Sequence, residues 1–92
     1  MVKYTLYIGA DNKTGNVDYE TLHAVLSERF QGYTVQDSTG YWEGKPEKSV
    51  VVTLFVDMPH TEVQDIVQTL RVKMKQDSIL LEVLHPVVGF IE

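Results

Sequence analysis

The sequence predicts one α+β domain spanning residues 1–92, with strands and helices in the order βαββαβ. Two observations lead to this fold class. Four short stretches are rich in apolar, β-branched and aromatic residues, which is typical of strands. Two other stretches carry their apolar residues at helical spacing. With 92 residues, 43% of them hydrophobic, the chain has room for one modest core.

The first strand is expected at residues 2–10, VKYTLYIGA, because every second side chain near its start is apolar. Residues 11–16, DNKTGN, are rich in turn formers and indicate a loop. A helix follows, with Asp18 as its expected N-cap and Gly32 as its expected stop. The apolar face of this helix consists of Tyr19, Leu22, Val25, Leu26 and Phe30.

Two strands joined as a hairpin are expected in the middle of the chain. They cover residues 33–42, YTVQDSTGYW, and residues 48–57, KSVVVTLFVD, and the residues between them form the connection. Glycines, aromatic residues and glutamates crowd together around this connection. A plain two-residue turn needs only Asn-Gly or Asp-Gly, so the richer composition raises the question of a function for the hairpin.

A second helix and a fourth strand complete the order. Pro59 closes the third strand, and Thr61 is the expected N-cap of the helix. The apolar face of that helix consists of Val63, Ile66, Val67, Leu70 and Met74. The fourth strand is expected at residues 78–84, SILLEVL, and ends before Pro86. Residues 87–92 then form a short terminal strand or an arm.

This order is that of the ferredoxin-like split βαβ sandwich, an antiparallel sheet with both helices on one face. The other face should be polar, because a one-sided sheet alternates apolar with polar residues. Here the third strand carries Val51 and Phe55 on that face, and the fourth strand carries Leu80 and Leu84. Something must cover these side chains. We therefore expect a cyclic homo-oligomer whose subunits pack their sheets inward.

Composition and charge narrow the choice of partner. The net charge is −5 and the eight Lys and Arg residues are scattered, whereas nucleic-acid binding requires a basic patch. A cationic or zwitterionic small ligand fits this charge better. Cysteine is absent, which excludes disulfides and thiolate chemistry. The three histidines lack the spacing of a metal site, so we expect no metal and no cofactor.

No targeting or membrane segment is recognisable in the sequence. Residues 1–10 lack the charged and long apolar regions of a signal peptide. No apolar run approaches the roughly 20 residues that span a bilayer. We therefore expect a cytoplasmic protein that does not bind a membrane.

Two glutamates near the hairpin, Glu43 and Glu47, are candidate binding residues. Either carboxylate can hold an ammonium group or ribose hydroxyls. The alternative is structural: Glu43 is then a solvated loop charge, and Glu47 is a polar gatekeeper beside an aggregation-prone strand. From residue type alone, the structural interpretation is the more frequent one.

Three aromatic residues, Tyr33, Tyr41 and Trp42, belong to the same hairpin. By alternation the two tyrosines share a face and Trp42 lies opposite. Aromatic rings stack on adenine or sit beside a cation, although strand aromatics more often serve cross-strand packing or subunit contacts. Asp77, beyond the second helix, either caps or contacts a neighbour. Walker A, G-x-G-x-x-G and G-x-S-x-G motifs are absent from the chain.

The chain resembles the small bacteriophage S-adenosylmethionine lyases, formerly called S-adenosylmethionine hydrolases. The resemblance rests on short motifs that occur in the same order along nearly the whole domain. They are YTLYIGA in the first strand, Thr39-Gly40-Tyr41-Trp42-Glu43, Pro46-Glu47-Lys48 before a valine-rich strand, and Gln76-Asp77-Ser78-Ile79-Leu80. A broader likeness is to PII-like proteins, which are trimeric ferredoxin-like modules that bind adenine nucleotides between subunits.

The lyase resemblance implies a reaction without water, in which the carboxylate of S-adenosylmethionine attacks its own γ-carbon. The products are homoserine lactone and 5′-methylthioadenosine, and the consequence in an infected host is loss of methylation-dependent defence. No cofactor is implied, and the likeness to PII-like proteins implies a trimer with sites between subunits. The implied catalytic residues are Glu47, which holds the α-ammonium, and Tyr41; the implied substrate-binding residues are Trp42, Glu43, Tyr33 and Asp77.

Two other functions stay open. The first is a PII-like module that binds an adenosine ligand without converting it, and the second is a phage protein whose hairpin contacts another protein. PII proteins hold nucleotide phosphates with basic residues, and no basic cluster is evident here. Because S-adenosylmethionine carries no phosphate, the acidic balance favours the lyase over a nucleotide sensor.

Overall fold

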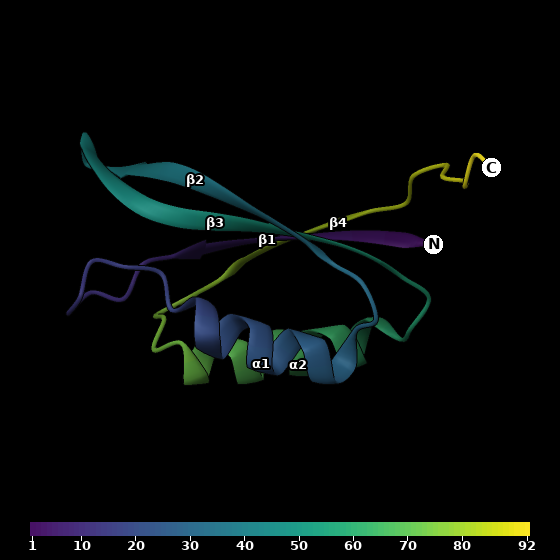
Figure 1. Ribbon diagram of the computed structural model, residues 1–92, viewed down its shortest axis with the longest axis horizontal. Helices are drawn as coiled ribbons and strands as arrows, with labels where there is room; N and C mark the ends of the chain where they lie inside the picture. The colour runs from purple at the N-terminus through teal and green to yellow at the C-terminus, as the bar shows by residue number, and fades with distance from the viewer.

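The computed structural model describes all of residues 1–92 and confirms the predicted element order. The elements are β1 (Val2–Gly9), α1 (Tyr19–Arg29), β2 (Thr34–Trp42), β3 (Lys45–Val56), α2 (His60–Lys73) and β4 (Leu80–Leu84). The strands form one antiparallel sheet in the order β2-β3-β1-β4. Both helices cover the same face of this sheet (Figure 1). The fold is therefore the predicted ferredoxin-like α+β sandwich.

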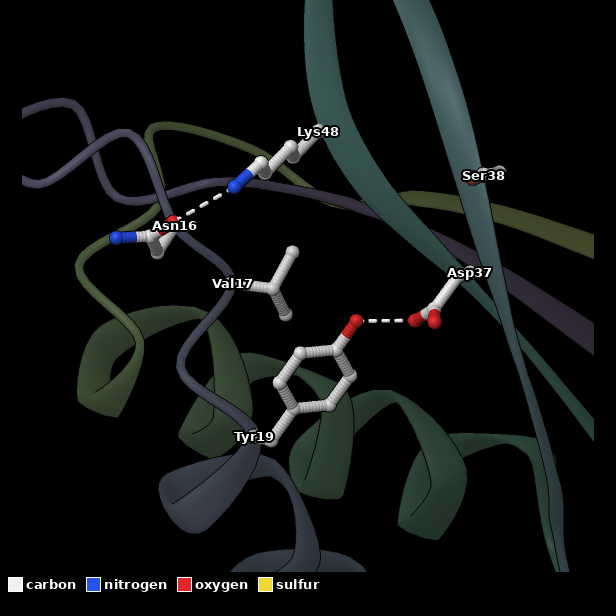
Figure 2. A pocket seen from close by; sticks show the side chains of 6 residues that line it. All are labelled: Asn16, Val17, Tyr19, Asp37, Ser38 and Lys48. Atoms are coloured by element: carbon white, nitrogen blue, oxygen red, sulfur yellow. Dashed lines mark hydrogen bonds between the residues drawn. The ribbon is translucent and has the colours of Figure 1, made fainter.

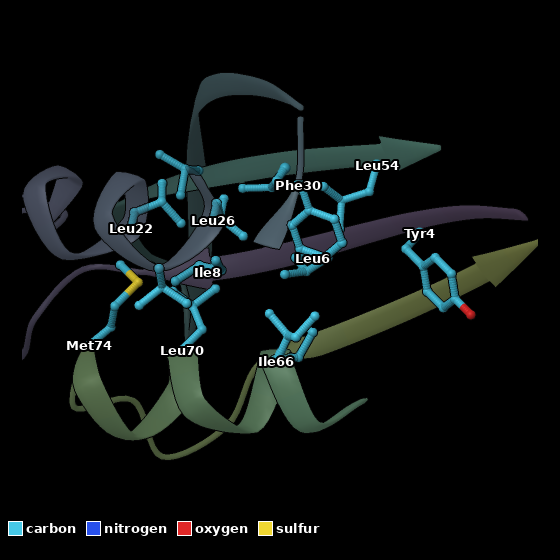
Figure 3. Packing of buried hydrophobic residues seen from close by; sticks show 14 of the residues in the cluster. Tyr4, Leu6, Ile8, Leu22, Leu26, Phe30, Leu54, Ile66, Leu70 and Met74 are labelled. Carbon is cyan, nitrogen blue, oxygen red and sulfur yellow. The ribbon is translucent and has the colours of Figure 1, made fainter. Parts of the chain in front are cut away.

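The core lies between the sheet and the helices (Figure 3). Alternate side chains of a strand point to opposite faces, so β1 and β3 give every second residue to the core. The buried strand residues are Tyr4, Leu6, Ile8, Val50, Val52 and Leu54. Helical and adjoining residues complete the cluster: Val17, Leu22, Val25, Leu26, Phe30, Val63, Ile66, Val67, Leu70 and Met74. Tyr19, which was expected on the apolar face of the first helix, is 40% exposed.

The helix starts agree with the sequence in one of two cases, and α1 ends at Arg29 with Phe30 as its C-cap, earlier than the predicted stop at Gly32. Asp18 caps α1 as predicted, because its carboxylate accepts the backbone N–H of Thr21 at 3.1 Å and the Thr21 hydroxyl at 2.7 Å. Thr61 does not cap α2, and that prediction is wrong. The helix begins at His60 behind Pro59, and no side chain caps it. The Pro59 carbonyl oxygen accepts the N–H groups of the first turn instead.

The β2–β3 hairpin is longer than predicted. Its register pairs Trp42 with Lys45, so only Glu43 and Gly44 form the turn. Both have positive φ, 50° and 78°, as a type I′ turn requires. Glu47 therefore lies inside β3, opposite Gly40, and not in a loop. The hairpin extends beyond the helices at one end of the sheet (Figure 1).

The face of the sheet opposite the helices carries large apolar side chains, as predicted, interspersed with polar ones such as Lys3 and Glu82. Tyr7, Phe55, Leu80 and Leu84 are between 42% and 67% exposed there. Beyond β4 the chain forms no further strand, so residues 87–92 form an arm and not the alternative terminal strand. Val87 and Ile91 of this arm are fully exposed. The open face and the arm together leave a large apolar area without a partner in the single chain.

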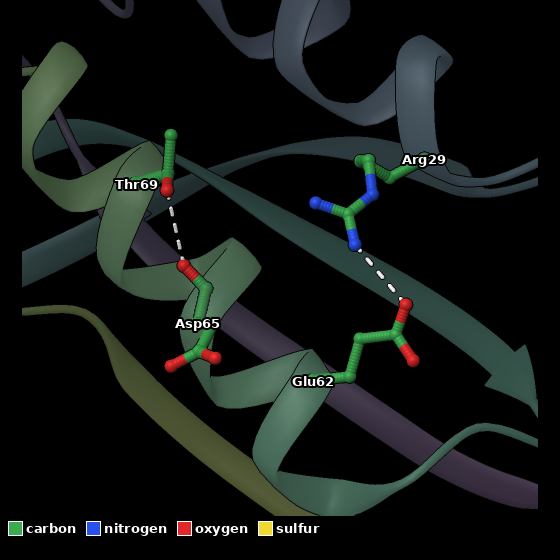
Figure 4. A network of polar contacts seen from close by, with 4 residues as sticks. All are labelled: Arg29, Glu62, Asp65 and Thr69. Atoms are coloured by element: carbon green, nitrogen blue, oxygen red, sulfur yellow. Dashed lines mark hydrogen bonds and ion pairs between the residues drawn. The ribbon is translucent and has the colours of Figure 1, made fainter.

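An ion pair joins the two helices at their surface (Figure 4). Arg29, the last residue of α1, pairs with Glu62 in the first turn of α2, at 3.1 Å between nitrogen and oxygen. Within α2 the Thr69 hydroxyl donates to the Asp65 carbonyl oxygen at 3.1 Å. Neither helix is long and apolar enough to cross a membrane.

Candidate functional site

Two adjoining pockets lie where the loop between β1 and α1 meets the β2–β3 hairpin. The Asp37 pocket has a volume of about 530 Å³, and its lining residues are Asn16, Val17, Tyr19, Asp37, Ser38 and Lys48 (Figure 2). The Glu47 pocket has a volume of about 350 Å³, and its lining residues are Ala10, Asp11, Asn12, Gly15, Pro46, Glu47 and Lys48. Lys48 lines both pockets. Their volumes fall in the range of small-molecule sites.

In the Asp37 pocket a carboxylate, a phenol and an ammonium line the same space (Figure 2). The Tyr19 hydroxyl, from the first turn of α1, donates to the Asp37 carboxylate of β2. This hydrogen bond raises the pKa of the Tyr19 phenol. Lys48 Nζ, from β3, donates to Asn16 Oδ1 at 3.0 Å. Because Val17 is buried between these pairs, the pocket combines polar walls with an apolar floor.

The Glu47 pocket is bounded by a tight turn. Asp11 Oδ1 accepts the backbone N–H of Lys13 at 2.7 Å, and the Gly15 N–H donates to the Asp11 carbonyl at 2.8 Å. Gly15 has φ of +73°, a conformation that favours glycine. The pocket is lined by the carboxylates of Asp11 and Glu47 and by the single ammonium of Lys48. Its net charge is therefore negative, which suits a cationic group.

Asp77 lies at the same end of the molecule as these pockets but lines neither. The residue before it, Gln76, donates from Nε2 to the Ala10 carbonyl oxygen at 3.2 Å. Arg71 in turn donates to the Gln76 carbonyl at 3.1 Å. These bonds fix the segment after α2 against the start of the β1–α1 loop, so Gln76, the residue before Asp77, contacts Ala10 of the Glu47 pocket.

The structure separates the aromatic candidates. Tyr41, Trp42 and Glu43 lie at the tip of the hairpin, and the two rings are 73% and 68% exposed. Tyr33 precedes β2 at the opposite end of that strand, where its hydroxyl lies 3.1 Å from Nδ1 of His23. It packs against the core beside α1. Within one chain, Glu47 is the one predicted site residue that lines a pocket with the β1–α1 loop.

Sequence reasoning missed the five residues with polar groups that line the Asp37 pocket, which are Asn16, Tyr19, Asp37, Ser38 and Lys48. Tyr19 was assigned to the apolar helix face by its spacing alone. Asp37 has the same strand parity as Val35, which packs against the core, so parity places its carboxylate on the helix side of the sheet. That parity was the available signal. No cluster of His, Cys, Asp or Glu side chains in the chain has the arrangement of a metal site.

Comparison with solved structures first defines the class of fold. The divalent cation tolerance protein CutA1 from Thermus thermophilus superposes with a TM-score of 0.60 at 12% identity, over 98% of this chain and 88% of that one. A sheet of antiparallel strands with two helices on one face is common to this group. The chain therefore has a CutA1-like and PII-like ferredoxin fold.

The fold of phage S-adenosylmethionine lyase is as similar to this chain as that of CutA1. Its structure without ligand gives a TM-score of 0.61 at 14% identity, over 90% of this chain and 78% of the lyase. Its complex with S-methyl-5′-thioadenosine gives 0.60 at 16% identity, over 90% and 79%. The resemblance stated from the sequence motifs is thus supported in the fold. No protein-family model and no curated sequence matches the chain.

Proposed function

We propose that this protein is an S-adenosylmethionine lyase that forms homoserine lactone and 5′-methylthioadenosine. Two independent lines support the proposal. Motifs in the order of the phage lyases run along the sequence, and the fold matches that of a phage lyase with and without S-methyl-5′-thioadenosine. The observation that carries the proposal is the position of Glu47, which places a carboxylate in a net-negative pocket of this fold.

The reaction balances without water or an added proton. An oxygen of the substrate carboxylate forms a bond to the γ-carbon, and the bond between that carbon and sulfur breaks. Its electron pair goes to sulfur, so the positive sulfonium becomes a neutral thioether and the carboxylate becomes a neutral lactone. Charge disappears along this path, and a pocket that excludes water therefore favours the transition state. Folding the methionine chain into attack geometry contributes further.

Glu47 holds the α-ammonium of the substrate in this proposal. A carboxylate placed against the sulfonium would stabilise the substrate more than the transition state, which would slow the reaction. The α-ammonium keeps its charge throughout, so its contact with Glu47 fixes the substrate without opposing the chemistry. Asp11 lies on the same pocket and adds to the negative potential. No general base is required.

Tyr41 and Trp42 supply the apolar wall beside the adenosine and the sulfonium. Both rings are more than two-thirds exposed at the hairpin tip and do not line the Glu47 pocket of their own chain. In a trimer with sites between subunits, the projecting hairpin brings these rings to the pocket of a neighbour. Glu43, Tyr33 and Asp77 remain proposed substrate-binding residues, and like the two rings they line neither pocket of their own chain.

The biological consequence of this activity is loss of S-adenosylmethionine in the cytoplasm of an infected host, and with it loss of methylation-dependent defence. The second candidate function is a binding module that holds an adenosine ligand without turnover. The complex of the similar phage structure with S-methyl-5′-thioadenosine is compatible with this alternative, because that ligand is itself an adenosine derivative.

Mass spectrometry separates the two functions. The protein is incubated with S-adenosylmethionine in water labelled with heavy oxygen, and the products are analysed after a short reaction. A lyase gives 5′-methylthioadenosine together with unlabelled homoserine lactone. A hydrolase would place the label on the γ-hydroxyl of homoserine. Binding of 5′-methylthioadenosine without any product would instead establish the module that does not convert its ligand.

A further inference from the structure

The Asp37 pocket contains binding groups that the proposed roles of Glu47 and the hairpin aromatics leave unused. Asp37 accepts one hydrogen bond, from the Tyr19 hydroxyl, and a carboxylate has about four lone-pair sites. Lys48 donates one hydrogen bond, to Asn16, and its ammonium has three donors. The pocket therefore keeps unused acceptors on one wall and unused donors on another.

Neither charge of this pocket is neutralised by an ion pair. The two ion pairs of the structure join the N-terminus to Asp57 and Arg29 to Glu62. Asp37 and Lys48 belong to neither. The Asp37 carboxylate and the Lys48 ammonium, which is shared with the Glu47 pocket, leave this pocket without a net positive charge. It therefore favours an uncharged polar ligand, because a phosphate brings about two negative charges and would meet the Asp37 carboxylate.

The chemistry of the walls indicates which uncharged ligand fits. A carboxylate accepts hydrogen bonds from the adjacent hydroxyls of a ribose, and such bonds are stronger than those between neutral groups. The half-exposed ring of Tyr19 and the buried Val17 supply apolar contact for a flat base. The pocket volume of about 530 Å³ is sufficient for a nucleoside. A ligand that occupied both pockets would pass Lys48, which lines each of them.

We infer that the Asp37 pocket binds the ribose of an unphosphorylated nucleoside, with the Asp37 carboxylate accepting hydrogen bonds from its 2′- and 3′-hydroxyls. This inference rests on the proposed function for the identity of the whole substrate, but it assigns a part of the site that the sequence motifs do not reach. Asp37 is a specificity-determining residue in this arrangement, and it selects nucleosides against nucleotides and against deoxynucleosides.

Calorimetric titration of the full chain tests the inference with adenosine, 2′-deoxyadenosine, 3′-deoxyadenosine and adenosine 5′-monophosphate. Adenosine is expected to bind about 10-fold more tightly than either deoxynucleoside and more tightly than the monophosphate. Asp37→Asn is expected to weaken adenosine binding about 10-fold and to reduce its preference over the deoxynucleosides. The matched control is Asp65→Asn on α2, where the same change lies away from both pockets.

Equal binding of adenosine and both deoxynucleosides to the wild-type chain would overturn the inference, as would unchanged adenosine binding by Asp37→Asn. The comparison of the four ligands uses the wild-type chain alone, so it still tests the inference if Asp37→Asn fails to fold. The lyase assay is read separately. If the chain forms lyase products but Asp37→Asn does not change adenosine binding, the inference is wrong and the proposed function stands. If Asp37→Asn weakens adenosine binding but the chain forms no products, the inference stands and the proposed function is wrong.

Discussion

Lys48 and Asn16 join the β2–β3 hairpin to the loop before α1, with 3.0 Å between Nζ and Oδ1. This contact brings residues 32 positions apart in sequence onto the boundary between the two pockets. Asn16 borders the Asp37 pocket, and Lys48 borders both. One strand of the hairpin thus places Glu47 and Lys48, consecutive residues of opposite charge, where a zwitterionic substrate would meet them.

Glu47→Gln is expected to lower kcat/KM for S-adenosylmethionine by about 10-fold to 100-fold. The change keeps the shape of the side chain and removes the charge that pairs with the α-ammonium, and a hydrogen bond to a charged group contributes roughly 1.5–3 kcal/mol. Product formation is followed by chromatography of 5′-methylthioadenosine. Glu28→Gln, an exposed position of α1, is the control. An unchanged rate for Glu47→Gln would remove this residue from the mechanism.

Asp18 gives the α1 cap a defined pH dependence. Its pKa lies below the ordinary value because the carboxylate accepts hydrogen bonds from the side chain and the backbone of Thr21. A lowered pKa in the folded state means that the charge contributes stability above the unfolded value of 3.8. That contribution is lost as the pH falls through the folded pKa. Asp18→Ala is expected to cost about 1 kcal/mol at neutral pH and less in acid.

Urea denaturation at neutral pH and at a series of acidic pH values extending below the unfolded pKa measures this difference. Asp18→Asn is the matched control, because its amide oxygen still caps the helix but does not titrate in this range. The difference in free energy of unfolding between the wild type and Asp18→Asn should therefore change with pH, whereas a pH-independent difference would contradict the assigned cause.

The fold was predictable because burial dictates the positions of apolar residues. Leu22 and Leu26 at helical spacing, and Val50 and Val52 in alternation, lie in the core as their patterns indicated. Helix starts are weaker signals. Thr61 has the residue type of an N-cap, but Pro59 directs the chain into the helix earlier, and its carbonyl accepts the first N–H groups.

The site was only partly predictable, since pockets arise from contacts between distant segments. Glu47 was identified from a motif, and its pocket partners in the β1–α1 loop were not. The bond between Tyr19 and Asp37 crosses from a helix to an edge strand, 18 residues later in the chain. No local pattern of either residue encodes that pairing. Local patterns therefore specified the elements, and tertiary packing created the Asp37 pocket.

Glu43→Asn is expected to stabilise the protein by roughly 0.5 kcal/mol. Glu43 has φ of 50°, a left-handed conformation that asparagine tolerates better than glutamate, and Asn-Gly is the preferred pair for a type I′ turn. Thermal and urea denaturation measure the change. Gly44→Ala, at φ of 78°, is expected to destabilise by about 1 kcal/mol. The same variants report on function, because a lyase rate unaffected by Glu43→Asn assigns Glu43 to the turn alone.

Phe55→Asp is expected to break the proposed trimer. Phe55 is 45% exposed on the open face of the sheet, where it and Leu84 of β4 flank Lys3 of β1. The introduced carboxylate would lack the apolar contact of Phe55 and would have to be desolvated in each copy of the interface even beside Lys3, so the association should weaken at least about 100-fold. Sedimentation velocity over a concentration series measures it. The control is Val72→Asp: Val72 lies on α2 and is 59% exposed, so this variant introduces the same charge away from the sheet.

Loss of lyase activity should accompany dissociation, because the proposed site takes Tyr41 and Trp42 from a neighbouring subunit. Phe55 itself lines neither the Asp37 pocket nor the Glu47 pocket, so a direct effect on substrate contacts is not expected. Activity of Phe55→Asp should therefore recover at protein concentrations that restore the oligomer. A wild-type chain that sediments as a monomer, or a monomeric variant with full activity, would show that one subunit supplies the whole site.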